Sequence, residues 1–431
     1  MQKIDLIVQG TLVPLVSDEI IPQGALAIDK GVIVACGKKQ EVLSRYRAST
    51  VLASERLVLP GLINGHTHVG MTLLRGVADD AKNLHEWLTD YIFPLEKKFL
   101  SEDFVYWSAI LSCYEMIQSG ITCFADMYFF ESAISKAVAH AGMRALLGET
   151  IFLPEDIAHA RDFCLSTHEP LVSGALAPHS LYSCDADTLV QAYAQAEALN
   201  VPLIIHVAEQ QDEVTQLRKK TGMSPADYMQ SLGILSERVI IAHGVHFSEE
   251  DLRIIGKSGA SIIYNPSSNM KLGSGIAPIK SMHENGIAVG LGTDGAASNN
   301  GLDEFIEMRT GALLQGLCVT DYCKPLTPFE MVKVATADGA RALKMGDLLG
   351  TLEVGKRADV IMVDDQHMHQ VPDYDVFSQL VYASKSTDVQ TVIIDGKIVM
   401  HNRKMIKLFD KMPQLRERVA FYQKKIREYR A

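Results

Sequence analysis

The sequence predicts an α/β protein, a (β/α)8 TIM barrel with a small β-sandwich module beside it, and three observations lead to this fold class. Eight short apolar runs, most followed by a segment with helical periodicity, occupy the middle of the chain. Stretches of β character flank this region on both sides. The length of 431 residues suits a barrel of roughly 250 to 300 residues plus a smaller module.

The eight apolar runs are the expected barrel strands. Amphipathic segments such as 187–199 and 248–257 lie between them and predict the outer helices. Eight such units indicate a closed parallel barrel rather than an open sheet, and we place this barrel at residues 58–349. The predicted strands are residues 61–64, 121–126, 145–148, 174–177, 202–206, 239–243, 260–264 and 288–292.

The two ends of the chain predict the β-sandwich module. Residues 1–57 contain short apolar runs separated by glycines, and residues 350–410 return to the same pattern. Each stretch is too short to form a domain, so we expect the two to join in one module. Residues 411–431 predict a surface helix, because their basic residues alternate with apolar ones.

The composition of the chain bears on whether the protein binds nucleic acid, spans a membrane or lies in the cytoplasm. The net charge is −11 and the barrel region has no dense basic block, so we expect no nucleic-acid partner. No apolar stretch of about 18 residues predicts a membrane span, and the first residues lack the apolar core of a signal peptide. Seven cysteines without a CxxC pair indicate reduced thiols and a cytoplasmic protein.

Histidines and an aspartate follow several of the predicted strands. His66 and His68 follow the first strand, and strand alternation places both imidazoles on one side. His206 ends the fifth strand, His243 ends the sixth, and Asp294 follows the eighth. The carboxyl ends of barrel strands meet at one face, so these side chains should converge there. We predict one divalent metal, Zn²⁺ or Fe²⁺, held by His66, His68, His206 and Asp294.

No other cofactor is expected. The chain has no GxGxxG motif opening a helix, no GxxxxGK[ST] loop and no GxSxG elbow. The remaining histidines carry no strand-end pattern, and we interpret them as ordinary core or surface residues.

Four motifs resemble the amidohydrolase superfamily: PGLINGHTH at 60–68, MTLLRGVA at 71–78, HxxE at 206–209 and LGTDGAASN at 291–299. Within it, the chain looks most like the 5'-methylthioadenosine/S-adenosylhomocysteine deaminases, with cytosine deaminases and triazine hydrolases as further relatives. The similarity runs from about residue 3 to about residue 405. Softer features are PLE at 94–96, APHS at 177–180 and NP at 265–266.

The resemblance implies a hydrolytic deaminase of an adenine nucleoside, giving an inosine-type product and ammonia. It implies that Glu96 contacts the ribose hydroxyls and His179 the base, and Trp87 is a further candidate for substrate contact. Our hypothesis for catalysis is that Asp294 takes a proton from the metal-bound water, His243 steadies that water or the developing charge, and Glu209 protonates a ring nitrogen. We expect a homo-oligomer, a dimer or a tetramer.

Two departures within the family sharpen the expectations. Some relatives bridge two metals with a lysine near the fourth strand, but Lys136 lies in a helical stretch, so we expect one metal, with Glu149 as an alternative bridging carboxylate. Relatives that bind the homocysteine group can carry an arginine where this chain has Glu149. Glu149 ends the third predicted strand, so we expect it at the pocket mouth, where its charge would repel the homocysteine carboxylate. We therefore expect 5'-methylthioadenosine or adenosine to be used at least as well as S-adenosylhomocysteine.

Two other functions stay open at this point. One is deamination or dechlorination of another purine, a pyrimidine or a triazine by the same kind of site. The other is a non-enzymatic scaffold that has kept the barrel without its chemistry.

Overall fold

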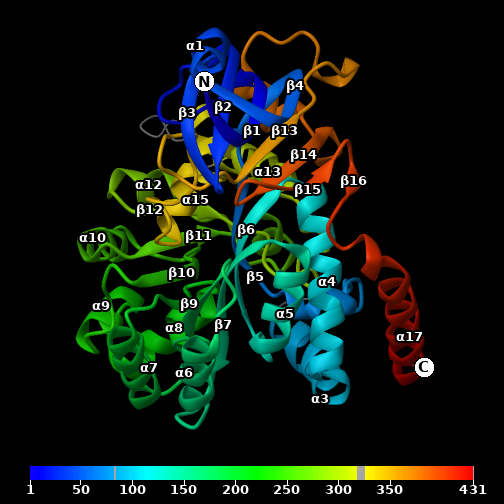
Figure 1. Ribbon diagram of the computed structural model, residues 1–431. Coiled ribbons are helices and arrows are strands. Elements are labelled where there is room, and N and C mark those ends of the chain that lie inside the picture. The colour runs from blue at the N-terminus through cyan, green and yellow to red at the C-terminus, as the bar shows by residue number, and fades with distance from the viewer. Residues whose placement is uncertain (82–83, 318–325, 431) are drawn as a thin grey trace.

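The computed structural model, shown in Figure 1, describes residues 1–81, 84–317 and 326–430. Eight parallel strands form one sheet, in the spatial order in which they follow one another in the sequence, which confirms the predicted barrel. Two cysteines, Cys318 and Cys323, lie outside the described residues. The barrel strands are β5 (Leu62–Thr67), β6 (Ile121–Tyr128), β7 (Arg144–Ile151), β8 (Val172–Pro178), β9 (Leu203–Val207), β10 (Val239–His243), β11 (Ser261–Tyr264) and β12 (Ala288–Leu291).

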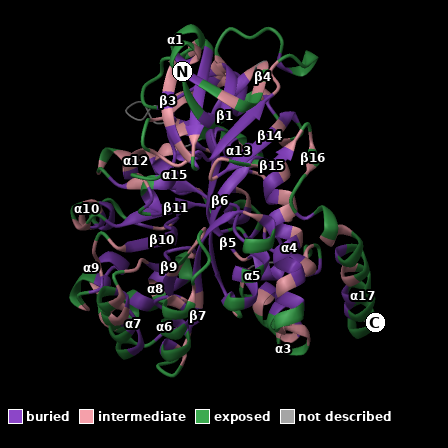
Figure 2. Ribbon diagram, in the orientation of Figure 1, coloured by how far each residue is buried: buried purple, intermediate pink, exposed green. Residues whose placement is uncertain are grey.

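Burial explains why these short runs become strands. Almost every strand residue is buried, because helices cover the outside of the sheet and side chains fill its inside, as the purple centre of Figure 2 shows. Strand alternation directs one set of side chains inward. The inward set includes Ile63, Ala125, Met127, Leu146, Ala177, Ile204, Ile240 and Ile263.

The last barrel strand, β12, lies beside the first, β5, and the segments that follow the two strands are hydrogen-bonded to each other. The Asp294 N–H donates to the His66 carbonyl at 2.9 Å, and the Thr293 N–H donates to Asn64 Oδ1 at 3.1 Å. These bonds fix the loop after β12 against the end of β5, where two of the predicted metal ligands lie.

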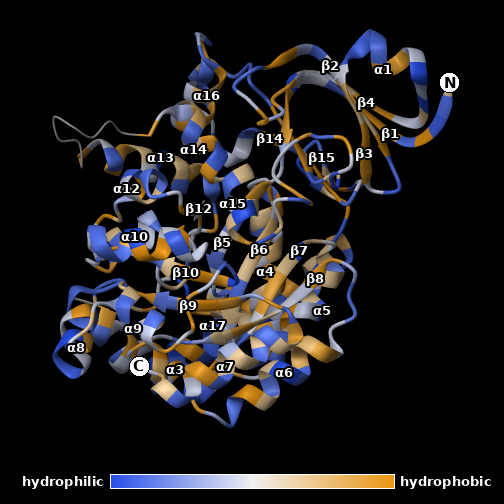
Figure 3. Cartoon of the chain, turned by 90° about the vertical axis from the view of Figure 1, so that its left-hand side faces the viewer, coloured by the Kyte–Doolittle hydropathy of each residue, from blue (hydrophilic) through white to orange (hydrophobic). Residues whose placement is uncertain are grey.

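Helices surround the barrel and carry polar residues outward, as the blue residues of α8 and α10 show in Figure 3. No helix in the described ranges is both long enough and apolar enough to cross a membrane. The principal helices are α4 (Glu102–Gln118), α5 (Glu131–Ala141), α6 (Asp156–Ser166), α7 (Ala186–Leu199), α8 (Gln211–Thr221), α9 (Pro225–Ser231), α10 (Glu249–Ser258), α11 (Pro266–Lys271), α12 (Ile279–Glu284), α13 (Glu304–Leu317), α14 (Pro328–Val334) and α15 (Ala337–Ala342).

A second, mixed sheet joins the two ends of the chain. Strands from both ends contribute to one apolar cluster, so the sheet has a core of its own. The helix α1 (Lys39–Arg45) covers its other face. In spatial order its strands are β16 (Lys404–Met405), β15 (Lys397–His401), β14 (Val389–Ile394), β13 (Val360–Val363), β4 (Tyr46–Pro60), β1 (Gln2–Leu12), β2 (Ile21–Asp29) and β3 (Val32–Lys38).

Helical segments after β5 and near the C-terminus complete the chain. The long helix α17 lies at the edge of the molecule in Figure 1 and is tied to α4 by a 2.6 Å hydrogen bond from the Tyr422 hydroxyl to Asp103. The segments after β5 are η1 (Val69–Leu74), α2 (Leu84–Glu86), η2 (Trp87–Ile92) and α3 (Phe93–Phe99). The later ones are η3 (Met368–Gln370), α16 (Val376–Ser378), η4 (Gln379–Ala383), η5 (Ser386–Asp388), η6 (Phe409–Lys411) and α17 (Met412–Arg430).

Candidate metal centre and active site

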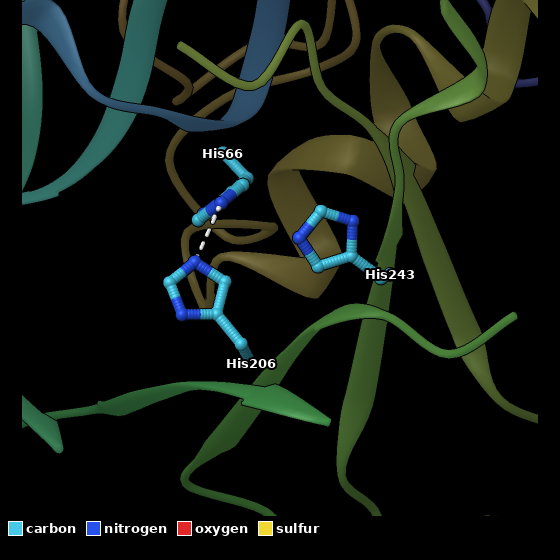
Figure 4. A group of neighbouring side chains, drawn as sticks. All are labelled: His66, His206 and His243. Atoms are coloured by element: carbon cyan, nitrogen blue, oxygen red, sulfur yellow. Dashed lines mark hydrogen bonds between the residues drawn. The ribbon is translucent and has the colours of Figure 1, made fainter. Parts of the chain in front are cut away.

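The predicted metal ligands converge at the carboxyl end of the barrel. His66 Nε2 lies 3.2 Å from His206 Nε2 and 3.6 Å from Asp294 Oδ1. His68 Nε2 lies 3.2 Å from the same Asp294 oxygen. His243 approaches from the next strand, and Figure 4 shows its ring beside those of His66 and His206. Four different strands or strand ends therefore supply one cluster.

Hydrogen bonds set the orientation of two imidazoles. His68 Nδ1 lies 2.6 Å from the Met127 carbonyl, and His206 Nδ1 lies 2.8 Å from the His179 carbonyl. A ring nitrogen that faces a carbonyl oxygen carries the proton, so the Nε2 lone pair of the neutral ring points into the cluster. For His68, burial acts to lower the pKa, but the hydrogen bond and charge of Asp294 raise it to about 9, so a bound metal would take the place of the second proton of this ring. This is the arrangement that a metal-binding histidine requires.

The Asp294 carboxylate is held on both of its oxygens. Oδ1 accepts the Gly295 N–H at 2.7 Å, and Oδ2 accepts the hydroxyls of Ser268 at 2.5 Å and Ser298 at 2.9 Å. Asp294 has a left-handed backbone with φ of 60°, a conformation that costs free energy and persists only when its surroundings enforce it. Burial acts to raise the pKa of Asp294, but the hydrogen bond with His68 and the nearby imidazoles hold it well below its ordinary value.

The donor set fits a divalent transition metal. Two groups of three residues place their ligand atoms within 4.8 Å of one another. Both groups contain His66. One adds His206 and His243, and the other adds His68 and Asp294. Burial lowers the pKa of His66 and His206 well below the ordinary value, so both rings are neutral. Neutral imidazoles and one carboxylate are ligands that Zn²⁺ and Fe²⁺ accept.

Glu209 lies beside this cluster as a buried acid. Its Oε2 is 3.8 Å from His243 Nε2, and the Glu213 carboxylate accepts the N–H groups of Ala208 and Glu209 at 3.0 Å each. Burial, and then the charges of Asp294 and Glu213, raise the pKa of Glu209 well above its ordinary value. A carboxyl group with a raised pKa keeps its proton to a higher pH than an ordinary carboxyl group does, and can donate it.

His243 is fixed from behind. Its Nδ1 lies 3.0 Å from the Asn269 amide and 3.3 Å from the Asn265 amide, so its Nε2 faces Glu209 and the cluster. Burial lowers the pKa of His243 to about 4, which keeps the ring neutral.

A cavity of about 270 Å³ opens onto the cluster and contains most of the predicted substrate contacts. Trp87, Glu96 and His179 all line it, together with Glu209. Its walls are otherwise mainly apolar, and no lysine or arginine is among the described residues that line it. The apolar wall consists of Met71, Leu84, Leu88, Ile92, Phe93, Met127, Phe129, Phe152 and Leu272, with the aromatic rings of Tyr128 and Tyr182.

The groups predicted to read the nucleoside are preorganised. Glu96 accepts a hydrogen bond from the Tyr128 hydroxyl, and burial raises the pKa of Glu96. The His179 ring stacks on Phe152 with 4.7 Å between centroids. Burial lowers the pKa of His179 to about 3, so it presents a neutral ring to the cavity.

The structure does not bring Glu149 to the pocket. Its two oxygens accept the N–H groups of Phe130 and Glu131 at 2.9 Å each, at the start of α5, and it belongs to neither group of possible metal ligands. The reason is the phase of β7: Leu146 points into the barrel, so Thr150 lines the cavity and Glu149 points toward the helices. The expected place at the pocket mouth is therefore wrong. Lys136 is exposed on α5, as its helical context predicted.

Several residues of the site were missed from the sequence. Ser268 and Ser298 hold Asp294, Tyr128 holds Glu96, and the Asp126 carboxylate accepts the N–H of Val69 at 2.7 Å. The available signal was position: Asp126 lies near the end of β6, Ser268 is in α11 directly after β11, and Ser298 lies in the loop after β12.

Comparison with known proteins adds the family. A model of the amidohydrolase family matches residues 57–399. This chain belongs to the amidohydrolase family.

Two relatives of this amidohydrolase carry the name 5-methylthioadenosine/S-adenosylhomocysteine deaminase. The protein of Syntrophobacter fumaroxidans is 42% identical over 435 residues, and the alignment covers 98% of each chain. That of Syntrophus aciditrophicus is 41% identical over 420 residues, with 94% of each chain covered. Among solved structures, an adenosine deaminase from Xanthomonas campestris with bound zinc superimposes with a TM-score of 0.95, at 32% identity and 99% coverage of each chain.

Proposed function

We propose that this amidohydrolase is a metal-dependent hydrolytic deaminase of adenine nucleosides. The observation that carries the proposal is one cavity in which the buried acid Glu209 lies next to the imidazole–carboxylate cluster, while Glu96 lines the same space. The names of the relatives support adenine nucleosides as the substrate class. The presence of all the predicted metal ligands, with Glu209 and His243 beside them, argues against a non-enzymatic scaffold.

Zn²⁺ is the metal we propose, held by His66, His68, His206 and Asp294. The donor set and the zinc in the Xanthomonas campestris structure support this choice. When bound at such a site, the metal lowers the pKa of a water molecule to roughly 7. All other steps belong to side chains of this chain.

In the proposed reaction, water replaces the 6-amino group of the adenine. The water oxygen forms a bond with C6 while Asp294 takes a proton from the water, and His243 steadies the attacking oxygen. Glu209 donates its proton to the neighbouring ring nitrogen, which makes C6 more electrophilic. Glu209, now a carboxylate, takes the proton of the C6 hydroxyl, and Asp294 passes its proton to the amino group, so that the C6–O bond becomes a carbonyl as the carbon–nitrogen bond breaks. The products are an inosine-type nucleoside and ammonia, and both carboxyl groups return to their starting states.

Glu96, His179 and Trp87 are the proposed binding residues. The Glu96 carboxylate has acceptor positions beyond the one used by Tyr128, and ribose hydroxyls can donate to them. His179 contacts the base and Trp87 covers it; all three line the cavity. The predicted homo-oligomer stays a prediction.

A substrate panel with direct detection of ammonia tests this function. The panel contains adenosine, 5'-methylthioadenosine, S-adenosylhomocysteine, adenine, guanine, cytosine and an amino-triazine. We expect the adenine nucleosides to have the highest kcat/KM. Ammonia release mainly from cytosine, guanine or the triazine would contradict the proposal and favour another branch of the same family.

A further inference from the structure

Two segments hold Asp294, the helix α11 after β11 and the loop after β12, and the helix α13 connects these two segments. Ser268 belongs to α11, after β11, and Ser298 lies in the loop after β12. Both hydroxyls donate to the same carboxylate oxygen, Asp294 Oδ2. The other oxygen faces His68 at 3.2 Å and His66 at 3.6 Å. The position of the serines therefore decides which oxygen the carboxylate presents to the imidazoles.

Glu307, in the first turns of α13, links the residues beside these serines. Its Oε2 accepts the N–H of Ser267 at 3.0 Å, and its Oε1 accepts the amide of Asn299 at 2.9 Å. Ser267 precedes Ser268 directly, and Asn299 follows Ser298 directly. The same Asn299 amide also donates to the Thr293 carbonyl at 2.7 Å, next to Asp294.

The Glu307 side chain is buried, and its carboxylate serves to connect the two segments. The residue is 1% exposed, and a buried carboxyl group costs free energy unless hydrogen bonds compensate for it. The hydrogen bonds from Ser267 and Asn299 both join α13 to other segments, so neither caps the helix itself.

We propose that Glu307 is a positioning residue for Asp294. It holds α11 and the loop after β12 at a fixed separation, so that the hydroxyls of Ser268 and Ser298 both donate to Oδ2 and Oδ1 stays directed at the histidine cluster. Glu307 lines neither the cavity nor the histidine cluster, and it acts through the segments that carry Ser268 and Ser298 and through the hydrogen bond from Asn299 to Thr293. The activity part of this inference rests on the proposed deaminase function, whereas the metal-binding part does not.

Glu307→Gln is the test variant, because it keeps the side-chain volume but places an N–H₂ group against one of two donors. Mutations of residues that support metal ligands typically cost about 10- to 100-fold in activity or metal affinity. We expect kcat to fall in that range with KM within about threefold. We also expect weaker Zn²⁺ binding in chelator competition and an altered Co²⁺ absorption spectrum.

Glu304→Gln is the matched control. Glu304 lies on the same helix and is 0% exposed, and neither of its carboxylate oxygens has a hydrogen-bond partner among the described residues. Its carboxyl group makes no hydrogen bond to the segments that hold Asp294, and its interaction with Glu307 is electrostatic only. We therefore expect kcat, Zn²⁺ affinity and the Co²⁺ spectrum of Glu304→Gln to match those of the wild type.

A double-mutant cycle separates positioning from general destabilisation. If Glu307 acts through Ser268, then Glu307→Gln combined with Ser268→Ala loses little more activity than the worse single variant. Additive losses, an equal loss in Glu304→Gln, or unchanged kcat and Zn²⁺ affinity in Glu307→Gln would overturn the proposal. If the wild type releases no ammonia from any nucleoside, the proposed function fails, and the Zn²⁺ and Co²⁺ measurements alone decide the role of Glu307.

Discussion

The two ends of the barrel use polar residues in opposite ways. At the carboxyl end, His66 and His243 are each 1% exposed and contact other polar side chains. At the amino end, Arg341 and Lys344 border a wider depression and are exposed to solvent. The same strands form both ends. Burial of mutually contacting polar groups costs free energy, and here it occurs where the carboxyl ends of the strands converge.

The largest expected effect comes from removing a metal ligand at the carboxyl end. We expect His66→Ala and Asp294→Ala to lose bound metal and to lower kcat/KM by several orders of magnitude, since both the metal and its activated water are lost. Metal analysis and ammonia release are the measurements. Lys344→Gln at the amino end is the control and should match the wild type. Full metal content in both ligand variants would remove the assignment of the ligands.

Glu209→Gln should have the next largest effect, because it removes a donated proton and leaves the predicted metal ligands in place. We expect kcat to fall about 10²- to 10⁴-fold with metal content unchanged. In the wild type, kcat should fall as pH rises through the elevated pKa of Glu209, because the protonated acid is the active form. A kcat of Glu209→Gln within about threefold of the wild type would exclude this residue as the proton donor.

Removing the ribose from the substrate should have a smaller effect on kcat/KM. Adenosine should have a higher kcat/KM than adenine, by roughly 10²-fold or more, because a buried acceptor rejects a substrate that leaves it unpaired. Glu96→Ala should reduce this ratio while leaving metal binding unchanged. An equal kcat/KM for adenosine and adenine in the wild type would remove the ribose contact from Glu96.

We still expect 5'-methylthioadenosine to be used at least as well as S-adenosylhomocysteine, but for a different physical reason. Glu149 does not reach the cavity, but Phe129 and Phe152 line it and no described lining residue is a lysine or arginine. An apolar 5'-methylthio group suits such walls better than a charged amino acid. We expect kcat/KM for 5'-methylthioadenosine to equal or exceed that for S-adenosylhomocysteine under one condition. A tenfold preference for S-adenosylhomocysteine would contradict this.

The smallest predicted effect concerns stability. Burial raises the pKa of Glu304 well above its ordinary value, so the folded state binds more protons than the unfolded state and stability falls as pH rises above the unfolded pKa. Glu304→Gln removes this penalty. Its Tm should exceed that of the wild type by more at pH 8 than at pH 5. A Tm difference that is independent of pH would show that Glu304 is not buried as an acid.

The sequence predicts the barrel well because each strand is a short apolar run between amphipathic segments. It also predicts the site where one residue type repeats at strand ends, as for His66, His206 and His243. It fails for Glu149, because its place at a strand end was read without the inward phase of β7. Ser268, Ser298 and Glu307 could not be predicted, since their roles depend on contacts between loops far apart in the sequence.

One titration tests the central claim that a single metal at the carboxyl end supports deamination. The protein is stripped with a chelator, Zn²⁺ is added back, and both bound metal and ammonia release from 5'-methylthioadenosine are measured. We predict that activity is absent without metal and rises in proportion to bound Zn²⁺ up to one ion per chain, and that Asp294→Ala stays inactive throughout. Activity in the stripped protein, or activity that appears only with a second bound ion, would contradict the account.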